Sequence, residues 1–121
     1  MAAYRKCKAQ TGRFLTALQD LNSRLDIGLT LQSYGDRLGD VKVAHDAVPA
    51  GELQYRCLKK VAVPAEGAPN VYLVVYREWD DCVTNYVDTC NVDRDLDTQS
   101  LWTAAAKSIR KAQAGLAQLR H

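Results

Sequence analysis

The stretch Val71-Tyr72-Leu73-Val74-Val75-Tyr76-Arg77-Glu78-Trp79 decides the fold class of this 121-residue chain. Its first six residues are β-branched, aromatic or leucine, which taken alone is typical of a β-strand. Apolar residues nevertheless recur at alternating spacings of three and four for longer than most strands last, without a turn signal: Tyr72, Val75, Trp79, Cys82 and Tyr86. Because this spacing places all five residues on one side of a helix, we predict a helix from about Pro69 to Val87.

The same alternation of threes and fours predicts three more long helices, over Tyr4–Leu25, Leu31–Val48 and Trp102–Leu119. A short helix is expected from about Glu52 to Val61, and the proline-containing segment Val63–Pro69 is expected to interrupt the chain after it. Four long helices with short connections predict an all-α fold, an up-and-down four-helix bundle with one short inserted helix.

Size and composition predict one globular domain over residues 1–121, because half the chain could bury little of its own surface. The formal net charge of +2 is too small to indicate a nucleic-acid partner or, by itself, a membrane surface. No apolar run approaches the roughly 20 residues of a membrane-spanning helix. The segment Met1–Lys6 also lacks the apolar stretch of a signal peptide.

Four cysteines in so short a chain favour an exported protein with two disulfides over a cytosolic protein with four buried thiols. Cys82 and Cys90 are eight residues apart, about 12 Å within one helix, so they can pair only where the helix ends and the chain turns back. In an up-and-down bundle the second helix returns the chain to the end where Cys7 lies, which brings Cys57 beside it. The expected pairs are therefore Cys7–Cys57 and Cys82–Cys90. Zinc is not expected, because no two cysteines have the close spacing of a zinc site.

Several short motifs together resemble one group of proteins: Cys7, Leu18-x2-Leu21-x3-Leu25-x2-Gly28-Leu29, Tyr34-Gly35-Asp36-Arg37-Leu38-Gly39-Asp40-Val41, Cys57, Tyr76-x2-Trp79-Asp80-Asp81-Cys82 and Trp102. Over most of its length the chain resembles small exported lipoproteins of actinobacteria, some of them encoded in phage or prophage regions. The resemblance implies an extracytoplasmic helical domain, tethered through a lipidated N-terminal cysteine that lies outside this sequence. It implies no activity and no catalytic residues.

Residues suited to catalysis are few, so we do not expect an enzyme. His45 lies on the apolar side of the second helix, where a hydrogen-bonded structural histidine is the commoner outcome, and the other histidine is the terminal His121. The segment Asp93-Arg94-Asp95-Leu96-Asp97 is similar to the start of a calcium loop. It has Thr98 and Ala104 where such a loop has its glycine and its last glutamate, so a solvated loop is expected, with no metal or cofactor.

Charge placement indicates where a partner could bind. Basic residues are expected to gather at the end of the bundle that holds the termini, and acidic residues near the other end. Carboxylates close to the C-terminus of a helix oppose its dipole, and a nearby tryptophan is a common interface anchor. The candidate interaction surface is therefore Trp79, Asp80, Asp81, Asp93 and Asp95. Charge that serves only solubility explains the same pattern equally well.

These features together predict a non-enzymatic, extracytoplasmic binding module of the cell envelope, whose partner is a protein. A phage-encoded superinfection-exclusion lipoprotein, which blocks infection at the envelope, is an alternative within that class. A carrier of a small ligand or a lipid is an alternative of a different class. A carrier needs a sizeable apolar pocket, whereas an interaction module needs an exposed patch and a filled core.

Overall fold

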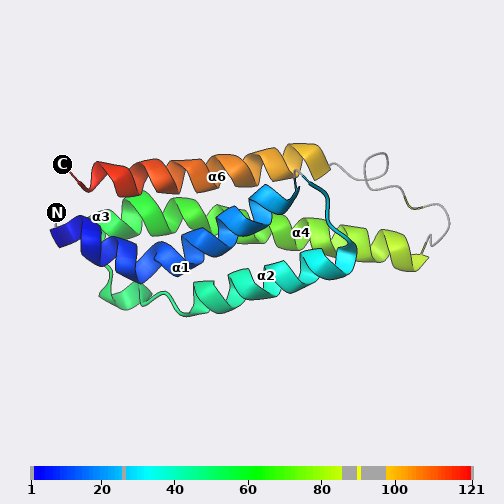
Figure 1. Ribbon diagram of the computed structural model, residues 1–121, viewed down its shortest axis with the longest axis horizontal. Helices are drawn as coiled ribbons and strands as arrows, with labels where there is room; N and C mark the ends of the chain where they lie inside the picture. Colours follow the sequence, from blue (N-terminus) through cyan, green and yellow to red (C-terminus); the bar gives the residue numbers. More distant parts are fainter. Residues whose placement is uncertain (1, 26, 86–89, 91–97, 121) are drawn as a thin grey trace.

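The computed structural model describes residues 2–25, 27–85, 90 and 98–120, and the described chain is helical without any strand (Figure 1). The four long helices are α1 (Ala2–Leu25), α2 (Leu31–Asp46), α4 (Val63–Asn85) and α6 (Thr98–Gln118). Three short elements connect α2 to α4: the 3₁₀ turn η1 (Ala50–Glu52), α3 (Tyr55–Cys57) and the π-helical turn η2 (Leu58–Ala62). The all-helical prediction is confirmed, and residues 71–76 are helical despite their strand-like composition.

The long helices form a bundle in which α1 packs against α2 and α6, and α4 packs against the same two helices. Both termini lie at one end of the bundle (Figure 1). The core contains the apolar residues of the repeating pattern, and the largest fully buried side chains among them are Tyr34, Tyr72, Leu18 and Leu21. None of the described helices is both long and apolar enough to span a membrane.

The predicted interruption at Val63–Pro69 is wrong, and so are the bounds of the short helix expected at Glu52–Val61. In the structure α3, η2 and α4 follow one another without a gap from Tyr55 to Asn85. In a regular α-helix the ring of Pro64 would clash with the carbonyl group of Lys60, four residues earlier. Lys60 lies in the wider π turn, which offers a physical reason why the helix continues past this proline.

The turn between α1 and α2 sets where α2 begins. Gly28 has a φ of +100°, a backbone conformation that favours glycine, and its N–H donates to the carbonyl group of Arg24. Thr30 then caps α2, because its hydroxyl oxygen accepts a hydrogen bond from the N–H of Ser33 at 3.1 Å. These two contacts direct the chain from α1 into α2.

All four cysteines are paired, as Cys7–Cys57 and Cys82–Cys90, which are the pairs expected from the sequence. The first bond joins α1 to α3, with the two Cα atoms 5.7 Å apart. The second joins the last turns of α4 to Cys90, with a Cα–Cα distance of 5.5 Å. Two disulfides in a chain of this length point to an oxidising, extracytoplasmic environment.

Candidate functional site

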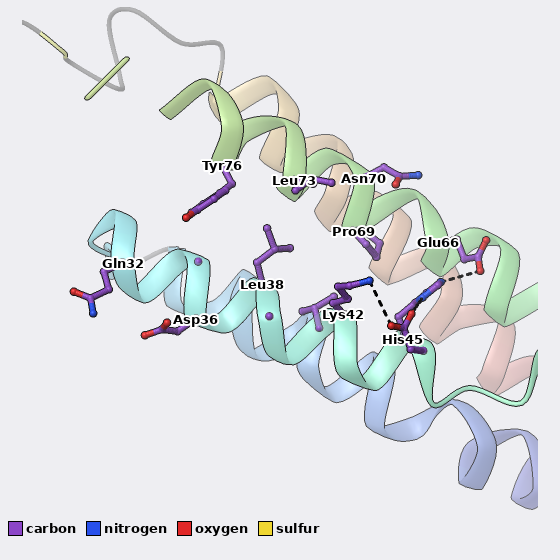
Figure 2. Close-up of a pocket in the computed structure, with 14 residues that line it drawn as sticks. Gln32, Asp36, Leu38, Lys42, His45, Glu66, Pro69, Asn70, Leu73 and Tyr76 are labelled. Carbon is purple, nitrogen blue, oxygen red and sulfur yellow. Dashed lines mark hydrogen bonds and ion pairs between the residues drawn. The ribbon is translucent and has the colours of Figure 1, made fainter. Parts of the chain in front are cut away.

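A groove with a largely apolar lining lies between α2 and α4 and has a volume of about 750 Å³ (Figure 2). Its apolar surface comes from both helices. In Figure 2, Leu38 points from α2 toward α4, and Tyr76 points from α4 toward α2. The residues that line the groove are Gln32, Gly35, Asp36, Leu38, Gly39, Val41, Lys42, His45 and Asp46 of α2, and Glu66, Pro69, Asn70, Leu73 and Tyr76 of α4.

Two glycines, one helical turn apart, make α2 narrow along this groove. At Gly35 the space that a side chain would need is already filled, because a Cβ atom there would lie 2.9 Å from the ring of Tyr76. At Gly39 a Cβ atom would meet no atom within 4 Å. The groove is therefore closed by Tyr76 near Gly35 and open beside Gly39.

A buried aromatic cluster attaches α2 to α4 behind one end of the groove. The hydroxyl of Tyr34 donates a hydrogen bond to the carbonyl group of Tyr72 at 2.8 Å, and Trp102 Nε1 donates to that hydroxyl at 3.4 Å. The ring of Tyr34 also stacks on that of Tyr76, with centroids 6.2 Å apart. Burial raises the pKa of the Tyr34 and Tyr72 phenols well above the ordinary value, so both stay neutral hydrogen-bonding groups.

His45 attaches the two helices at the other end of the groove. Its Nδ1 lies 3.2 Å from a carboxylate oxygen of Asp46, and its Nε2 lies 3.1 Å from Oε1 of Glu66 on α4 (Figure 2). The hydrogen bond with Asp46, and after it that with Glu66, raises the pKa of the imidazole, although partial burial opposes the shift. His45 is thus a hydrogen-bonded histidine, as predicted, but it is only half-buried and also contacts the ring of Phe14.

A second hollow of about 450 Å³ lies on the other side of this histidine, between α2, η2 and α4. Phe14, Val48, Leu58 and Val63 contribute to its apolar lining. His45, Asp46 and Glu66 line both hollows, so their hydrogen bonds form the partition between them.

The groove is acidic as well as apolar. Its lining contains three carboxylates and one lysine, a net charge of −2 when His45 is neutral. Asp36 lies near one end and Asp46 with Glu66 at the other, and ten residues of α2 between the two aspartates correspond to about 15 Å. Lys42 lies 3.5 Å from Asp46 and offsets part of its charge.

The residues predicted to form an interaction surface lie in different surroundings. Trp79 is half-buried, and its ring centroid is 5.7 Å from that of Tyr34, so it extends the aromatic cluster rather than projecting into solvent. Asp80 and Asp81 are exposed in the last turns of α4. Asp93 and Asp95, with the whole segment that is similar to a calcium loop, lie outside the described residues. The predicted surface therefore stays a prediction.

The groove itself did not follow from reasoning on the sequence, although a signal for it was present. Gly35 and Gly39 share one side of α2 with Leu38, and two glycines on an apolar helix side leave room for a neighbour.

Within the described ranges, no three His, Cys, Asp or Glu side chains are grouped closely enough to hold a metal ion. The chain matches none of the protein-family models, curated proteins or solved structures compared with it.

Proposed function

We propose that this chain is a non-enzymatic, extracytoplasmic binding module, the ectodomain of a cell-envelope lipoprotein, and that it binds a protein partner through the groove between α2 and α4. In this proposal the long helices alternate in direction along the chain, as an up-and-down four-helix bundle. The observation that carries the proposal is an open apolar groove with carboxylates at both ends, beside a core of fully buried side chains.

An α-helix of the partner is the occupant that this groove fits best. Helix-binding grooves accept the apolar side of an amphipathic helix through residues spaced three and four apart. Here the apolar contacts would come from Leu38 on α2 and from Leu73 on α4, which are both half-buried at the groove. Because the lining is acidic, the matching helix carries basic residues at both ends of its apolar segment, about ten residues apart.

A synthetic peptide tests this proposal directly. The probe is an amphipathic helix of about 16 residues, with leucines at helical spacing in the middle and lysines at both ends. A second peptide has glutamates in place of the lysines. Fluorescence anisotropy of the labelled peptides should show that the lysine peptide binds, and that the glutamate peptide binds at least about tenfold more weakly because its charges repel Asp36 and Glu66.

A matched pair of glycine substitutions shows whether the peptide occupies the groove. Gly39→Leu places a side chain in the open part of the groove, whereas Gly12→Leu places one on α1, and a Cβ atom at either position meets no atom within 4 Å. We expect Gly39→Leu to weaken binding of the lysine peptide by at least about tenfold, and Gly12→Leu to leave it unchanged. Equal effects of the two substitutions, or no binding of either peptide, would contradict the proposal.

A carrier of a small apolar ligand is the second candidate, because about 750 Å³ lies within the usual range of ligand pockets. Native mass spectrometry after incubation with palmitate separates the two functions. A one-to-one complex that Gly39→Leu abolishes would favour the carrier. Failure to retain palmitate, together with binding of the lysine peptide, favours the protein-binding module.

Superinfection exclusion is a special case of the main proposal, in which the partner is an envelope protein that a phage needs for entry. Cells that express the anchored protein should then resist infection, and cells that express its Gly39→Leu variant should lose that resistance. If cells that express the Gly39→Leu variant still resist infection, exclusion does not depend on the groove.

A further inference from the structure

The end of the bundle that holds the termini is strongly basic, although the formal net charge of the whole chain is only +2. At that end, residues 2–8, 53–62 and 112–120 contain seven Lys or Arg residues and no Asp or Glu, and Glu52 directly precedes the second of these segments. The disulfide Cys7–Cys57 brings the first two segments together. Lys60 joins the third, since its Nζ donates to Oε1 of Gln118 at 3.1 Å. Seven basic residues close to these contacts define the basic end: Arg5, Lys6, Lys8, Arg56, Lys59, Lys60 and Arg120.

Ion pairing does not explain these charges, although Arg120 donates a hydrogen bond to the hydroxyl of Tyr4 at 2.7 Å. All seven side chains are exposed except Lys60, which is half-buried, and none forms an ion pair with a carboxylate in the part of the chain that the structure describes. Arg5 and Lys6 lie near the N-terminus of α1, and Arg56 near the start of the continuous helical run from Tyr55. A helix dipole disfavours cations at its N-terminus, so these positions oppose the local electrostatics.

Exposed apolar side chains accompany the basic ones. Tyr55 is 71% exposed, and Lys59 Nζ lies 5.8 Å from the centre of its ring. Leu58 and Val63 are exposed close by in the chain. Aromatic and aliphatic groups set among lysines and arginines are suited to the boundary between lipid headgroups and acyl chains.

We infer that the basic end binds the surface of an anionic phospholipid membrane, so that the bundle rests on the membrane by the end that holds its termini. An anionic surface attracts each nearby Lys or Arg, and several such residues act together. A soluble polyanion such as DNA is less well matched, because the two disulfides place the chain outside the reducing cytoplasm. This contact is independent of the groove, whose carboxylates would repel the same lipids.

Vesicle flotation tests the inference with the protein itself. The probes are vesicles of phosphatidylcholine alone and vesicles that contain about 30% phosphatidylglycerol, in about 0.1 M NaCl, where the Debye length is about 10 Å. We expect the protein to float with the anionic vesicles and not with the neutral ones. At about 1 M NaCl, where screening shortens the Debye length to about 3 Å, it should be released.

Two triple variants distinguish the effect of the basic end on vesicle binding from the effect of the net charge of the protein. One is Lys6→Glu, Lys8→Glu and Lys59→Glu; the control is Arg77→Glu, Lys107→Glu and Arg110→Glu, at exposed positions farther from the termini. Each reversal changes the charge by −2, so both variants take the formal net charge from +2 to −4. The basic-end variant should lose at least about 100-fold in vesicle partitioning, and the control less than about tenfold.

Both variants should keep the helical circular dichroism of the parent, since all six side chains are exposed and glutamates near the N-terminus of α1 suit its dipole. Equal losses in the two variants would overturn the inference, because net charge alone would then explain binding. Failure of the parent protein to float with anionic vesicles would also overturn it. So would tighter binding to a DNA duplex of about 20 base pairs than to the vesicles, because the partner would then be a soluble polyanion.

Discussion

Helix α4 packs closely against α6 on one side and only partly against α2 on the other. On the α6 side, a Cβ atom at Gly67 of α4 would lie only 3.0 Å from Oγ of Ser108 on α6. Gly115 of α6 lies so close to the continuation of α4 that a Cβ atom there would overlap the carbonyl group of Lys60. On the α2 side Gly39 faces open space, and the groove remains.

The difference shows that glycines alone do not bring two helices together. On the closed side, alanine or glycine is present on both helices, so the backbones approach until they touch. On the open side, Gly35 of α2 meets the ring of Tyr76, whereas Gly39 meets no side chain of α4. The aromatic cluster and the His45–Glu66 contact then fix α2 at its two ends, and the groove lies between these attachments.

The largest effect should come from removal of the disulfide Cys7–Cys57, which joins α1 to α3. In the loop-entropy description, removal of Cys7–Cys57, which spans 50 residues, costs roughly 4 kcal/mol, and removal of Cys82–Cys90, which spans eight, roughly 2.5 kcal/mol. Urea denaturation of the two double alanine variants measures both values. If removal of Cys82–Cys90, which closes the shorter loop, lowered the free energy of unfolding more, native contacts rather than chain entropy would determine the order of the two effects.

Gly115→Ala should lower the free energy of unfolding by about 2 kcal/mol, because the added methyl group must displace the backbone of Lys60. This loss includes the gain in helix propensity of roughly 1 kcal/mol that alanine brings. Gly12→Ala is the control, since its Cβ meets no atom within 4 Å and only the gain should appear. Equal stabilisation of both variants would mean that α4 and α6 are not closely packed.

Gly39→Ala should change stability in the opposite direction to Gly115→Ala. It should raise the free energy of unfolding by up to about 1 kcal/mol, through helix propensity alone. Thermal unfolding compared with that of Gly115→Ala measures the contrast between the two sides of the bundle in one experiment. A destabilised Gly39→Ala protein would show that the groove closes in solution.

The smallest effect is the pH dependence of the His45 contact. Its folded pKa is raised, so its contribution to stability is fully present below the unfolded value near 6.5 and is lost as the pH rises through the folded pKa. The side chain is 39% exposed, so solvent screening limits the effect to a few tenths of a kcal/mol. His45→Gln should abolish the difference in stability between about pH 5.5 and pH 8 that the parent protein shows. If the parent protein were more stable at the higher pH, the hydrogen bonds of His45 with Asp46 and Glu66 would not stabilise the fold as described.

The sequence predicted the helices because periodicity survives even in a strand-like segment such as residues 71–76. It predicted the disulfides because the expected up-and-down order of the helices brings only certain cysteines together, and the two pairs are those expected. It did not predict that the helix continues past Pro64, because the signal for a break is local, whereas the π turn and the burial of Ala65 and Ala68 depend on packing against α6.

The groove is harder to predict than the helices for a related reason. Gly35 and Gly39 indicate that something lies close to α2, but not whether a neighbouring helix fills the space. That outcome depends on Tyr76 and Leu73, which belong to another helix about 35 residues further along the chain. Trp79 follows the apolar spacing of its helix, which favours a place in the core, and its ring does extend the aromatic cluster. The predicted surface therefore depends on its carboxylates.

Methyl NMR of the protein, titrated with the lysine-ended peptide, tests most directly whether the two sides of α4 differ as described. We predict that the methyl signals of Leu38 and Leu73 shift progressively, because these side chains line the groove. Those of Val61 in η2 and Ile109 in α6, which are buried in the core, should stay in place. Shifts of equal size on both sides of α4, or shifts confined to residues outside the groove, would contradict it.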